Sequence, residues 1–343
     1  ISGFDGFENP GNEDIKYYYP TSVLVTGWDI IFFWVARMIF AGYEFMDEKP
    51  FKKVYFTGMV RDLQRRKMSK SLGNSPDALG LIDQYGADGV RVGMLLSSAA
   101  GNDLLFDEKL CEQGRNFSTK IWNAFRLVKN WEIVDEPASQ KNTLAKEWFE
   151  ARYNQVLVEV EDHFSKFRLS DALMSVYKLI WDDFCSWYLE IIKPGYQQPI
   201  DQAILDATIK FFENILKIMH PFTPFIAEEI WHLLDERAEG DDIIIAEWPK
   251  AQAFNQANID GFDKACEVIS NIRNIRKENN IANKIAVELM VKANSEMDKS
   301  FDTVISKIGN LAKFEYVSEK VSNAFSFISK NNEYFVPLGE EVN

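Results

Sequence analysis

The feature that most constrains the fold is an alternation of strand-like and helix-like segments near the start of the chain. Residues 22–26 and residues 53–57 are short, mainly apolar runs of strand type. Between them, residues 29–45 follow a helical period after a turn at Gly27, and Asp29 is suited to cap that helix. Two strands joined by a helix pair in parallel through a crossover. Ligands of such sheets bind beyond the carboxyl ends of the strands, so we expect a site near Gly27 and Asp29.

The rest of the chain changes from this mixed pattern to a mostly helical one. The expected helices cover residues 107–131, 144–164, 170–192, 200–219, 224–235 and 259–278. After residue 285, alternating stretches such as 286–291 and 313–317 indicate strands again. The expected fold class is therefore α/β followed by mostly α, ending in a small α/β appendage.

One polar segment has a composition suited to chemistry. Residues 65–74 read Arg-Arg-Lys-Met-Ser-Lys-Ser-Leu-Gly-Asn, and they contain the two lysines Lys67 and Lys70. The hydroxyl groups and the final Gly-Asn pair favour a loop over a regular helix or strand. A mobile loop with two ammonium groups can close over a polyphosphate and neutralise charge that develops in a transition state. A solvated basic turn is the simpler alternative.

The charge distribution permits an RNA partner although the chain is acidic overall. The net charge of −14 disfavours indiscriminate binding to phosphate. Screening limits the reach of each charge to about 8–10 Å at physiological salt, so local clusters matter more than the sum. Six basic residues are candidate contacts to an RNA backbone, with a solvated surface charge as the alternative for each: Arg115, Lys120, Arg126, Arg273, Arg276 and Lys277.

Cysteine and histidine usage predicts neither a metal site nor a disulfide framework. The three cysteines are widely spaced, which is typical of a reducing compartment. The histidines lack metal-ligand spacing, and we expect structural roles for His220 and His232. The longest apolar run, residues 30–36, is too short to span a bilayer, and no signal sequence precedes it. We therefore expect a cytoplasmic protein with no zinc and no membrane partner.

The segment around the lysines resembles class I aminoacyl-tRNA synthetases. Residues 67–71, Lys-Met-Ser-Lys-Ser, match the signature loop of that family letter for letter. Residues 19–38 resemble the strand and helix that build the amino-acid pocket of its valyl-type members. Residues 180–190 and 219–231 resemble the anticodon-binding bundle of the valyl, isoleucyl and leucyl enzymes. Gly89 departs from the alanine usual in the helical stem beneath the loop, at a cost of about 1 kcal/mol in helix propensity.

The resemblance implies ATP-dependent activation of valine and its transfer to tRNA(Val). Lys70 would hold the β- and γ-phosphates of ATP, which binds with Mg²⁺, and Lys67 would assist. The ATP-binding segment would comprise Lys67, Met68, Ser69, Lys70 and Ser71. The amino-acid pocket would include Trp34, Asp29 and Gly27, among apolar positions that suit a short branched side chain. An ordinary core aromatic is the alternative for Trp34.

The same resemblance implies that the chain is a C-terminal part of such an enzyme. The family's histidine-containing ATP motif, editing domain and C-terminal coiled coil have no counterpart in the sequence. The chain alone is therefore expected to be an inactive, tRNA-binding monomer. The alternatives are an isoleucyl- or leucyl-type fragment, which the apolar helix after Asp29 disfavours, and a free-standing tRNA-binding module.

The expected domains follow the same correspondence. They are the end of a Rossmann-like catalytic domain, the signature loop with its stem-contact region, a helical anticodon-binding domain and the appendage. In that order their expected bounds are residues 1–62, 63–106, 107–285 and 286–343.

Overall fold

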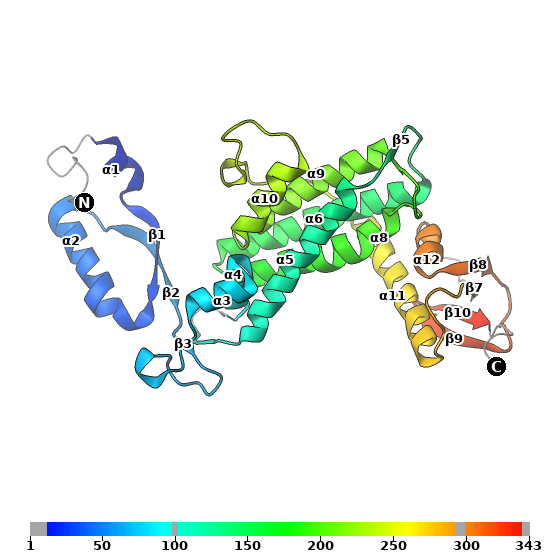
Figure 1. The fold of residues 1–343 in the computed structure, drawn as a ribbon, viewed down its shortest axis with the longest axis horizontal. Coiled ribbons are helices and arrows are strands. Elements are labelled where there is room, and N and C mark those ends of the chain that lie inside the picture. Colours follow the sequence, from blue (N-terminus) through cyan, green and yellow to red (C-terminus); the bar gives the residue numbers. More distant parts are fainter. Residues whose placement is uncertain (1–11, 98–101, 293–298, 338–343) are drawn as a thin grey trace. The chain divides into compact units, whose positions relative to one another are not determined.

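The computed structural model describes residues 12–97, 102–292 and 299–337 (Figure 1). The chain divides into two compact units. The first contains residues 1–116 and 161–174, and the second contains residues 117–160 and 175–343. No helix in the described ranges has the length and apolar content needed to cross a membrane.

The first unit begins with the expected strand–helix–strand arrangement. After α1 (Glu13–Tyr18), strands β1 (Thr21–Gly27) and β2 (Phe51–Thr57) pair in parallel, which confirms the prediction. The segment that connects β1 to β2 begins with a 3₁₀ turn (Trp28–Ile30) and a π-helical turn (Ile31–Val35), and it continues as α2 (Ala36–Met46).

The predicted cap of this connecting helix is wrong. Gly27 occupies the cap position, and no side chain bonds the free backbone nitrogens there. Asp29 instead lies within the first turn, with its carboxylate folded back over Gly27, where an added Cβ would meet Oδ1 at 2.7 Å. The irregular entry places Asp29 where its carboxylate remains free to meet another segment of the unit.

A second part of the first unit supports the lysine segment. Strands β3 (Val60–Arg61) and β4 (Leu104–Leu105) pair in parallel. Helices α3 (Ala78–Tyr85) and α4 (Ala87–Leu96) pack with the start of α5 (Glu108–Lys129). The buried cluster in this region consists of Leu81, Tyr85, Leu104, Phe106 and Cys111.

Glycines bring α4 and α5 unusually close together. A Cβ on Gly93 would lie 2.6 Å from the backbone nitrogen of Cys111, and one on Gly114 would lie 2.4 Å from the carbonyl oxygen of Gly89. Gly89 itself faces the backbone of Arg115, at 3.0 Å from an added Cβ. The helix propensity lost at Gly89 is therefore offset by a close contact between two helix backbones.

The second unit is mostly helical, as expected. It contains most of α5, most of α6 (Gln140–Ser165) and the end of α7 (Leu169–Lys178), whose remaining turns belong to the first unit. It also contains α8 (Leu189–Ile192), α9 (Gln202–Met219), α10 (Pro224–Leu234) and α11 (Gln256–Glu278). A π-helical segment (Leu179–Tyr188) joins α7 to α8, and β5 (Ile133–Val134) pairs with β6 (Ile200–Asp201).

Aromatic side chains form the core of this bundle. Trp148 on α6 stacks on Phe262 of α11 with ring centroids 3.6 Å apart. Phe184 of the π-helical segment packs against Phe149 and Phe212, and all three are fully buried. The aromatic periodicity of the sequence therefore reflects packing between helices.

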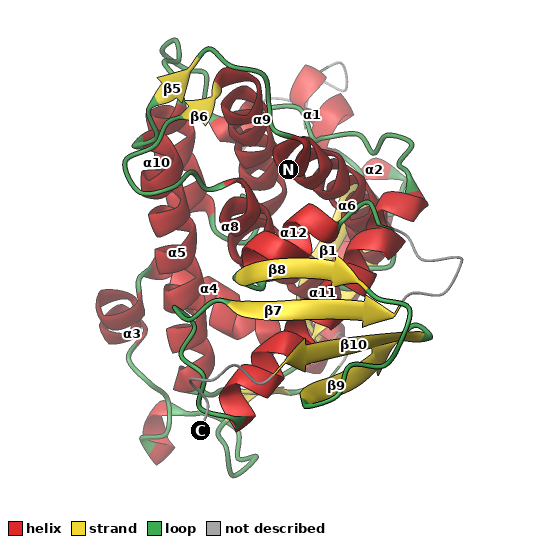
Figure 2. Ribbon diagram, turned by 90° about the vertical axis from the view of Figure 1, so that its right-hand side faces the viewer, coloured by secondary structure: helices red, strands yellow, loops and turns green. Residues whose placement is uncertain are grey.

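The last part of the second unit is the expected α/β appendage. Strands lie in the order β8 (Leu311–Tyr316), β7 (Val287–Lys292), β10 (Asn332–Pro337) and β9 (Ala324–Ser329) (Figure 2). The β7–β8 pair is parallel and the other two pairs are antiparallel. Helix α12 (Asp302–Ile308) precedes β8 and packs against α11.

Candidate functional site

The carboxylate of Asp62 closes the first half of the lysine loop, residues 62–74. Its Oδ1 accepts hydrogen bonds from the backbone nitrogens of Gln64 at 3.0 Å and Arg66 at 2.8 Å. Its Oδ2 accepts from Arg66 Nε at 2.8 Å and from Asn74 Nδ2 at 3.0 Å. Led by the bond from Asn74, these contacts lower the pKa of Asp62 to about 2, so the group is charged at neutral pH.

The amide of Asn74 holds the second half of the loop. Its Oδ1 accepts from the backbone nitrogen of Ser69 at 3.0 Å. Its Nδ2 donates to the backbone oxygen of Lys67 at 3.3 Å, in addition to the bond to Asp62. One side chain thus bonds the backbone on both sides of Met68 and ties it to the first turn.

A single 3₁₀ turn, residues 70–72, carries the second lysine. Ser69 Oγ caps this turn by accepting from the Leu72 nitrogen at 3.3 Å, and it lies 3.1 Å from Ser71 Oγ. Gly73 ends the turn at φ +61°, a left-handed conformation that glycine adopts without steric cost. The sequence prediction of a loop without regular helix or strand is confirmed, apart from this short turn.

Met68 anchors the loop to the helices beneath it. Its side chain packs against the buried cluster formed by α3, β4 and α5. Its backbone nitrogen donates to Val60 O at 3.2 Å, next to a bridge between Arg61 and Lys67. A cavity of about 510 Å³ lies between the loop and Phe106, with Met68 and Asn74 in its wall. The methionine thus fixes the loop at its centre.

The two lysines extend from this fixed backbone into solvent. The Lys67 side chain is 62% exposed, and Lys70 is also exposed. Lys67 Nζ lies 4.0 Å from Asp29 Oδ2, so the structure brings together one residue of the predicted ATP segment and one of the predicted amino-acid pocket. Lys70 forms no ion pair with any residue in the described ranges. Both ammonium groups are therefore available to an anionic ligand.

The strand that leads into the loop is held by Asp103. Its Oδ2 pairs with Arg61 Nε, and its Oδ1 accepts from the Met59 nitrogen at 2.9 Å. Trp28 also donates to this carboxylate from the turn after β1. These bonds, led by the one from Arg61, lower the pKa of Asp103. Asp103 therefore has a structural role in an ion pair, and nothing in the sequence identifies Arg61 or Trp28 as its partners.

Trp34 of the predicted pocket is partly exposed in this chain. It is 49% exposed, and its neighbours Phe32 and Phe33 are 82% and 74% exposed. The π-helical turn Ile31–Val35 thus carries three consecutive aromatic side chains that are exposed in this chain. Gly27 lies at the carboxyl end of β1, as predicted.

Four candidate RNA-contacting residues keep their charges accessible at least in part. Arg126 and Lys277 are exposed near the carboxyl ends of α5 and α11. Arg115 pairs with Glu112 at 3.5 Å, and Arg273 lies over the ring of Trp187 at 5.0 Å.

The charged groups of the other two candidates are engaged in contacts within the fold. Lys120 donates to Ser186 Oγ at 2.9 Å and lies 4.1 Å above the ring of Trp181. Arg276 is 4% exposed, and its guanidinium donates to four backbone oxygens, those of Ala282, Ile285, Gly309 and Asn310. This burial assigns Arg276 a structural role instead of the predicted RNA contact.

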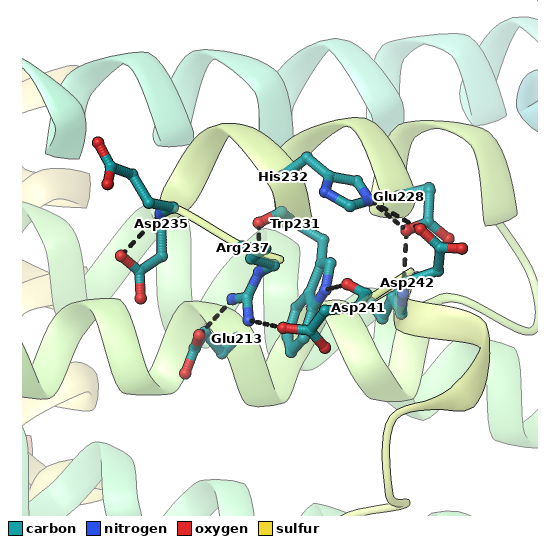
Figure 3. Close-up of polar contacts among 10 residues, drawn as sticks. Glu213, Glu228, Trp231, His232, Asp235, Arg237, Asp241 and Asp242 are labelled. Atoms are coloured by element: carbon teal, nitrogen blue, oxygen red, sulfur yellow. Dashed lines mark hydrogen bonds and ion pairs between the residues drawn. The ribbon is translucent and has the colours of Figure 1, made fainter. Parts of the chain in front are cut away.

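His232 belongs to a polar group that sequence spacing alone did not reveal (Figure 3). Its Nε2 lies 3.1 Å from Glu228 Oε1, one turn earlier on α10, and 3.2 Å from Asp242 Oδ1 in the following loop. The three ligand atoms lie within 4.8 Å of one another, close enough to hold one metal ion. Glu228 also accepts from the Ile243 nitrogen at 2.9 Å, so the group joins α10 to this loop without an ion.

Two family models match this chain. The model of class I tRNA synthetases (I, L, M and V) matches residues 3–107, and the model of the anticodon-binding domain of tRNA ligase matches residues 146–291. Together they confirm the expected fold class, in which a catalytic-domain segment precedes an anticodon-binding domain.

Curated relatives match along the whole chain. The valine–tRNA ligase of Christiangramia forsetii is 56% identical over 345 residues, and that of Parabacteroides distasonis is 55% identical over 344 residues. Each match covers 100% of this chain and 39% of the relative. The valine–tRNA ligase of Thermotoga maritima is 37% identical, covering 95% of this chain and 38% of the relative. The chain thus spans about two fifths of the length of these relatives.

Solved structures show the same fold at lower sequence identity. Mycobacterium tuberculosis methionyl-tRNA synthetase bound by methionyl-adenylate matches with a TM-score of 0.54 and 19% identity, over 73% of this chain and 52% of that chain. Agrobacterium radiobacter LeuRS, in a ternary complex with tRNA and LeuAMS, matches with a TM-score of 0.53 and 18% identity, over 70% of this chain and 29% of that chain. The chain belongs to the class I tRNA synthetases, in the valine–tRNA ligase family.

Proposed function

We propose that this chain is part of a cytoplasmic, monomeric valine–tRNA ligase and that the lysine loop serves its ATP-dependent step. In this step the carboxylate oxygen of valine attacks the α-phosphorus of ATP, the bond to the β-phosphate oxygen breaks, and pyrophosphate leaves. Negative charge then builds on the departing phosphates. Two exposed ammonium groups on a fixed backbone are suited to stabilise that charge.

The observation that carries the proposal is the exposure of Lys67 and Lys70 on a loop whose backbone is tied down by Asp62, Met68 and Asn74. Lys70 has the role of holding the β- and γ-phosphates, and Lys67 assists it. The 4.0 Å approach of Lys67 to Asp29 supports a shared site for ATP and the amino acid. The residues present fit the phosphates of ATP, since the loop offers cations and hydroxyl groups to phosphate oxygens, and Mg²⁺ would bind with the nucleotide.

Valine-dependent exchange of pyrophosphate into ATP tests the proposal in the full-length protein. Lys70→Ala is expected to lower the exchange rate by about 100- to 1,000-fold, the usual effect of losing one positioned charge donor. Lys52→Ala removes an exposed lysine of β2 and serves as the matched control, with exchange close to that of the unchanged protein. Undiminished exchange in the Lys70 variant would refute the role of the loop.

The helical bundle has the proposed role of binding tRNA(Val). The exposed charges of Arg126, Arg273 and Lys277 support electrostatic contacts with its backbone. Filter binding of the chain to valine and isoleucine tRNAs across a salt series tests this role. Lys277→Ala is expected to reduce the salt slope by about 1 unit or less. Equal affinity for both tRNAs, with no salt dependence, would contradict it.

A further inference from the structure

The lysine loop is held by a small network in which each polar atom has a defined partner. The Asn74 amide bonds the backbone of Lys67 and Ser69, the residues on either side of Met68. Its remaining hydrogen bond goes to the Asp62 carboxylate, which organises the preceding turn. The lysines contribute no side-chain atom to this network. Asn74 and Asp62 therefore hold the loop backbone, and Lys67 and Lys70 carry the charges that face solvent.

The burial of the network agrees with a holding role. The Asp62 side chain is 14% exposed although it is ionised, and its four acceptor contacts satisfy the charge. Met68 fixes the same stretch from the other side by packing on the buried cluster. An exposed loop needs such ties to keep one geometry, because ordering each residue costs about 1–2 kcal/mol of backbone entropy.

We propose that Asn74 and Asp62 form a clasp that positions Lys67 and Lys70 for the ATP-dependent step. Both are positioning residues, since they act through the backbone of the lysines and do not touch the phosphates. The inference rests on the proposed function of the loop. It predicts that loosening the clasp slows transfer of the adenylyl group to valine although every lysine is retained, because small misplacements of a positioned group are costly.

The clasp can be tested by exchanging the side chains of Asn74 and Asp62 through mutation. Asn74→Asp keeps the size of the side chain but replaces the donor with a second carboxylate facing Asp62. Asp62→Asn places two amide nitrogens against each other. In the double variant, the amide introduced at position 62 can donate to the carboxylate introduced at position 74, so their mutual bond is restored. The bond to the Lys67 oxygen and the bond from Arg66 Nε both remain lost, so rescue is expected to be incomplete.

Limited digestion with trypsin tests the clasp on the chain itself. Arg65, Arg66, Lys67 and Lys70 supply cleavage sites within the loop, and mass spectrometry identifies cuts there. We expect Asn74→Asp to speed loop cleavage about 10-fold while the urea midpoint of the chain stays nearly unchanged. The double variant is expected to regain most of the protection. Equal cleavage in all forms would overturn the clasp, and so would a double variant that is cleaved as fast as Asn74→Asp.

Exchange kinetics in the full-length protein test the consequence. Asn74→Asp is expected to lower kcat about 10- to 100-fold with an unchanged KM for valine, and the double variant to recover to within about 5-fold. Lys70→Ala is run beside them. If Lys70→Ala loses exchange but Asn74→Asp does not, the positioning role fails and the proposed function stands. If Lys70→Ala retains exchange, the proposed function fails, and the digestion result still reports on the clasp.

Discussion

The basic side chains of the lysine loop point into solvent, whereas Arg276 on α11 is buried and holds the fold together. On the lysine loop, an amide and a carboxylate hold the backbone, and Lys67 and Lys70 extend into solvent. On α11, Arg276 turns its guanidinium inward and bonds four backbone oxygens. Exposure of the charged group, and not residue type alone, therefore separates the binding candidates of this chain from the structural Arg276.

The largest expected effect concerns Arg276. Arg276→Met is expected to lower the free energy of unfolding by about 3 kcal/mol, because it leaves buried carbonyl groups without donors. Lys277→Met, at the next and exposed position of α11, is the control and is expected to change it by less than about 0.5 kcal/mol. Urea unfolding measures both. Equal effects would remove the distinction between the inward and outward charges.

The next effect concerns Asp183 in the π-helical segment. Burial raises the pKa of Asp183 to about 7, with Asp182, Asp263 and Glu159 adding to the rise and Arg152 opposing it. Because the folded pKa exceeds the ordinary value of 3.8, the folded state binds the extra proton, and its stability falls as the pH rises from about 4 to 7. Asp183→Asn is expected to remove this decline.

Urea unfolding between pH 4 and pH 8 measures the slope. The Asn variant is expected to exceed the original protein in stability by about 2 kcal/mol at pH 8, with little difference at pH 4. Asp206→Asn, at an exposed carboxyl of α9 that does not contribute to the pKa of Asp183, is the control and is expected to keep the original slope. Parallel pH profiles for the original protein and Asp183→Asn would show that the carboxyl is not protonated in the fold.

A smaller effect is expected at Tyr188, which is fully buried in the bundle. Its hydroxyl lies 2.8 Å from Thr208 Oγ1, and that hydroxyl donates to Ile204 O at 2.7 Å, so Tyr188 is the donor of the pair. Tyr188→Phe is expected to cost about 1 kcal/mol of stability. Tyr196→Phe, at a side chain that is 92% exposed, is expected to cost almost nothing by the same thermal or urea measurement. A cost at Tyr196 as large as that at Tyr188 would contradict this assignment.

The smallest effect is expected for the loop lysines themselves. Lys67→Ala and Lys70→Ala are each expected to change the free energy of unfolding by less than about 0.5 kcal/mol, since both side chains are exposed. A large loss of stability in either variant would place the lysines among the supports of the fold and would erase the contrast with Arg276.

Local periodicity and turn chemistry predicted most of the fold. The β1–β2 pair, the long helices of the bundle and the final strands all follow the expected segments. The π-helical turn before α2 was missed, because a run of Ile, Phe and Trp looks the same in any helical form. The structural role of Arg276 was also missed, because its partners are backbone oxygens, which every residue carries and which therefore leave no signal in the sequence.

The sequence predicted the two lysines of the candidate site, but not all of the residues that hold their backbone in place. Lys67 and Lys70 are recognisable by sequence, whereas the role of Asn74 depends on a left-handed turn at Gly73 that returns the chain to Lys67. Asp103 lies 42 residues from Arg61, and only the parallel pairing of β3 with β4 brings them together. Such long-range contacts leave no periodic signal in one sequence.

The glycines between α4 and α5 have a consequence for protein engineering. Replacing a helical glycine by alanine is a standard way to raise thermal stability, because it restricts the unfolded chain. At Gly93 and Gly114 the added methyl group would strike the backbone of the opposite helix, at 2.6 and 2.4 Å, so the usual gain becomes a loss. Thermostabilised versions of this chain would have to gain stability at other positions and leave these two glycines unchanged.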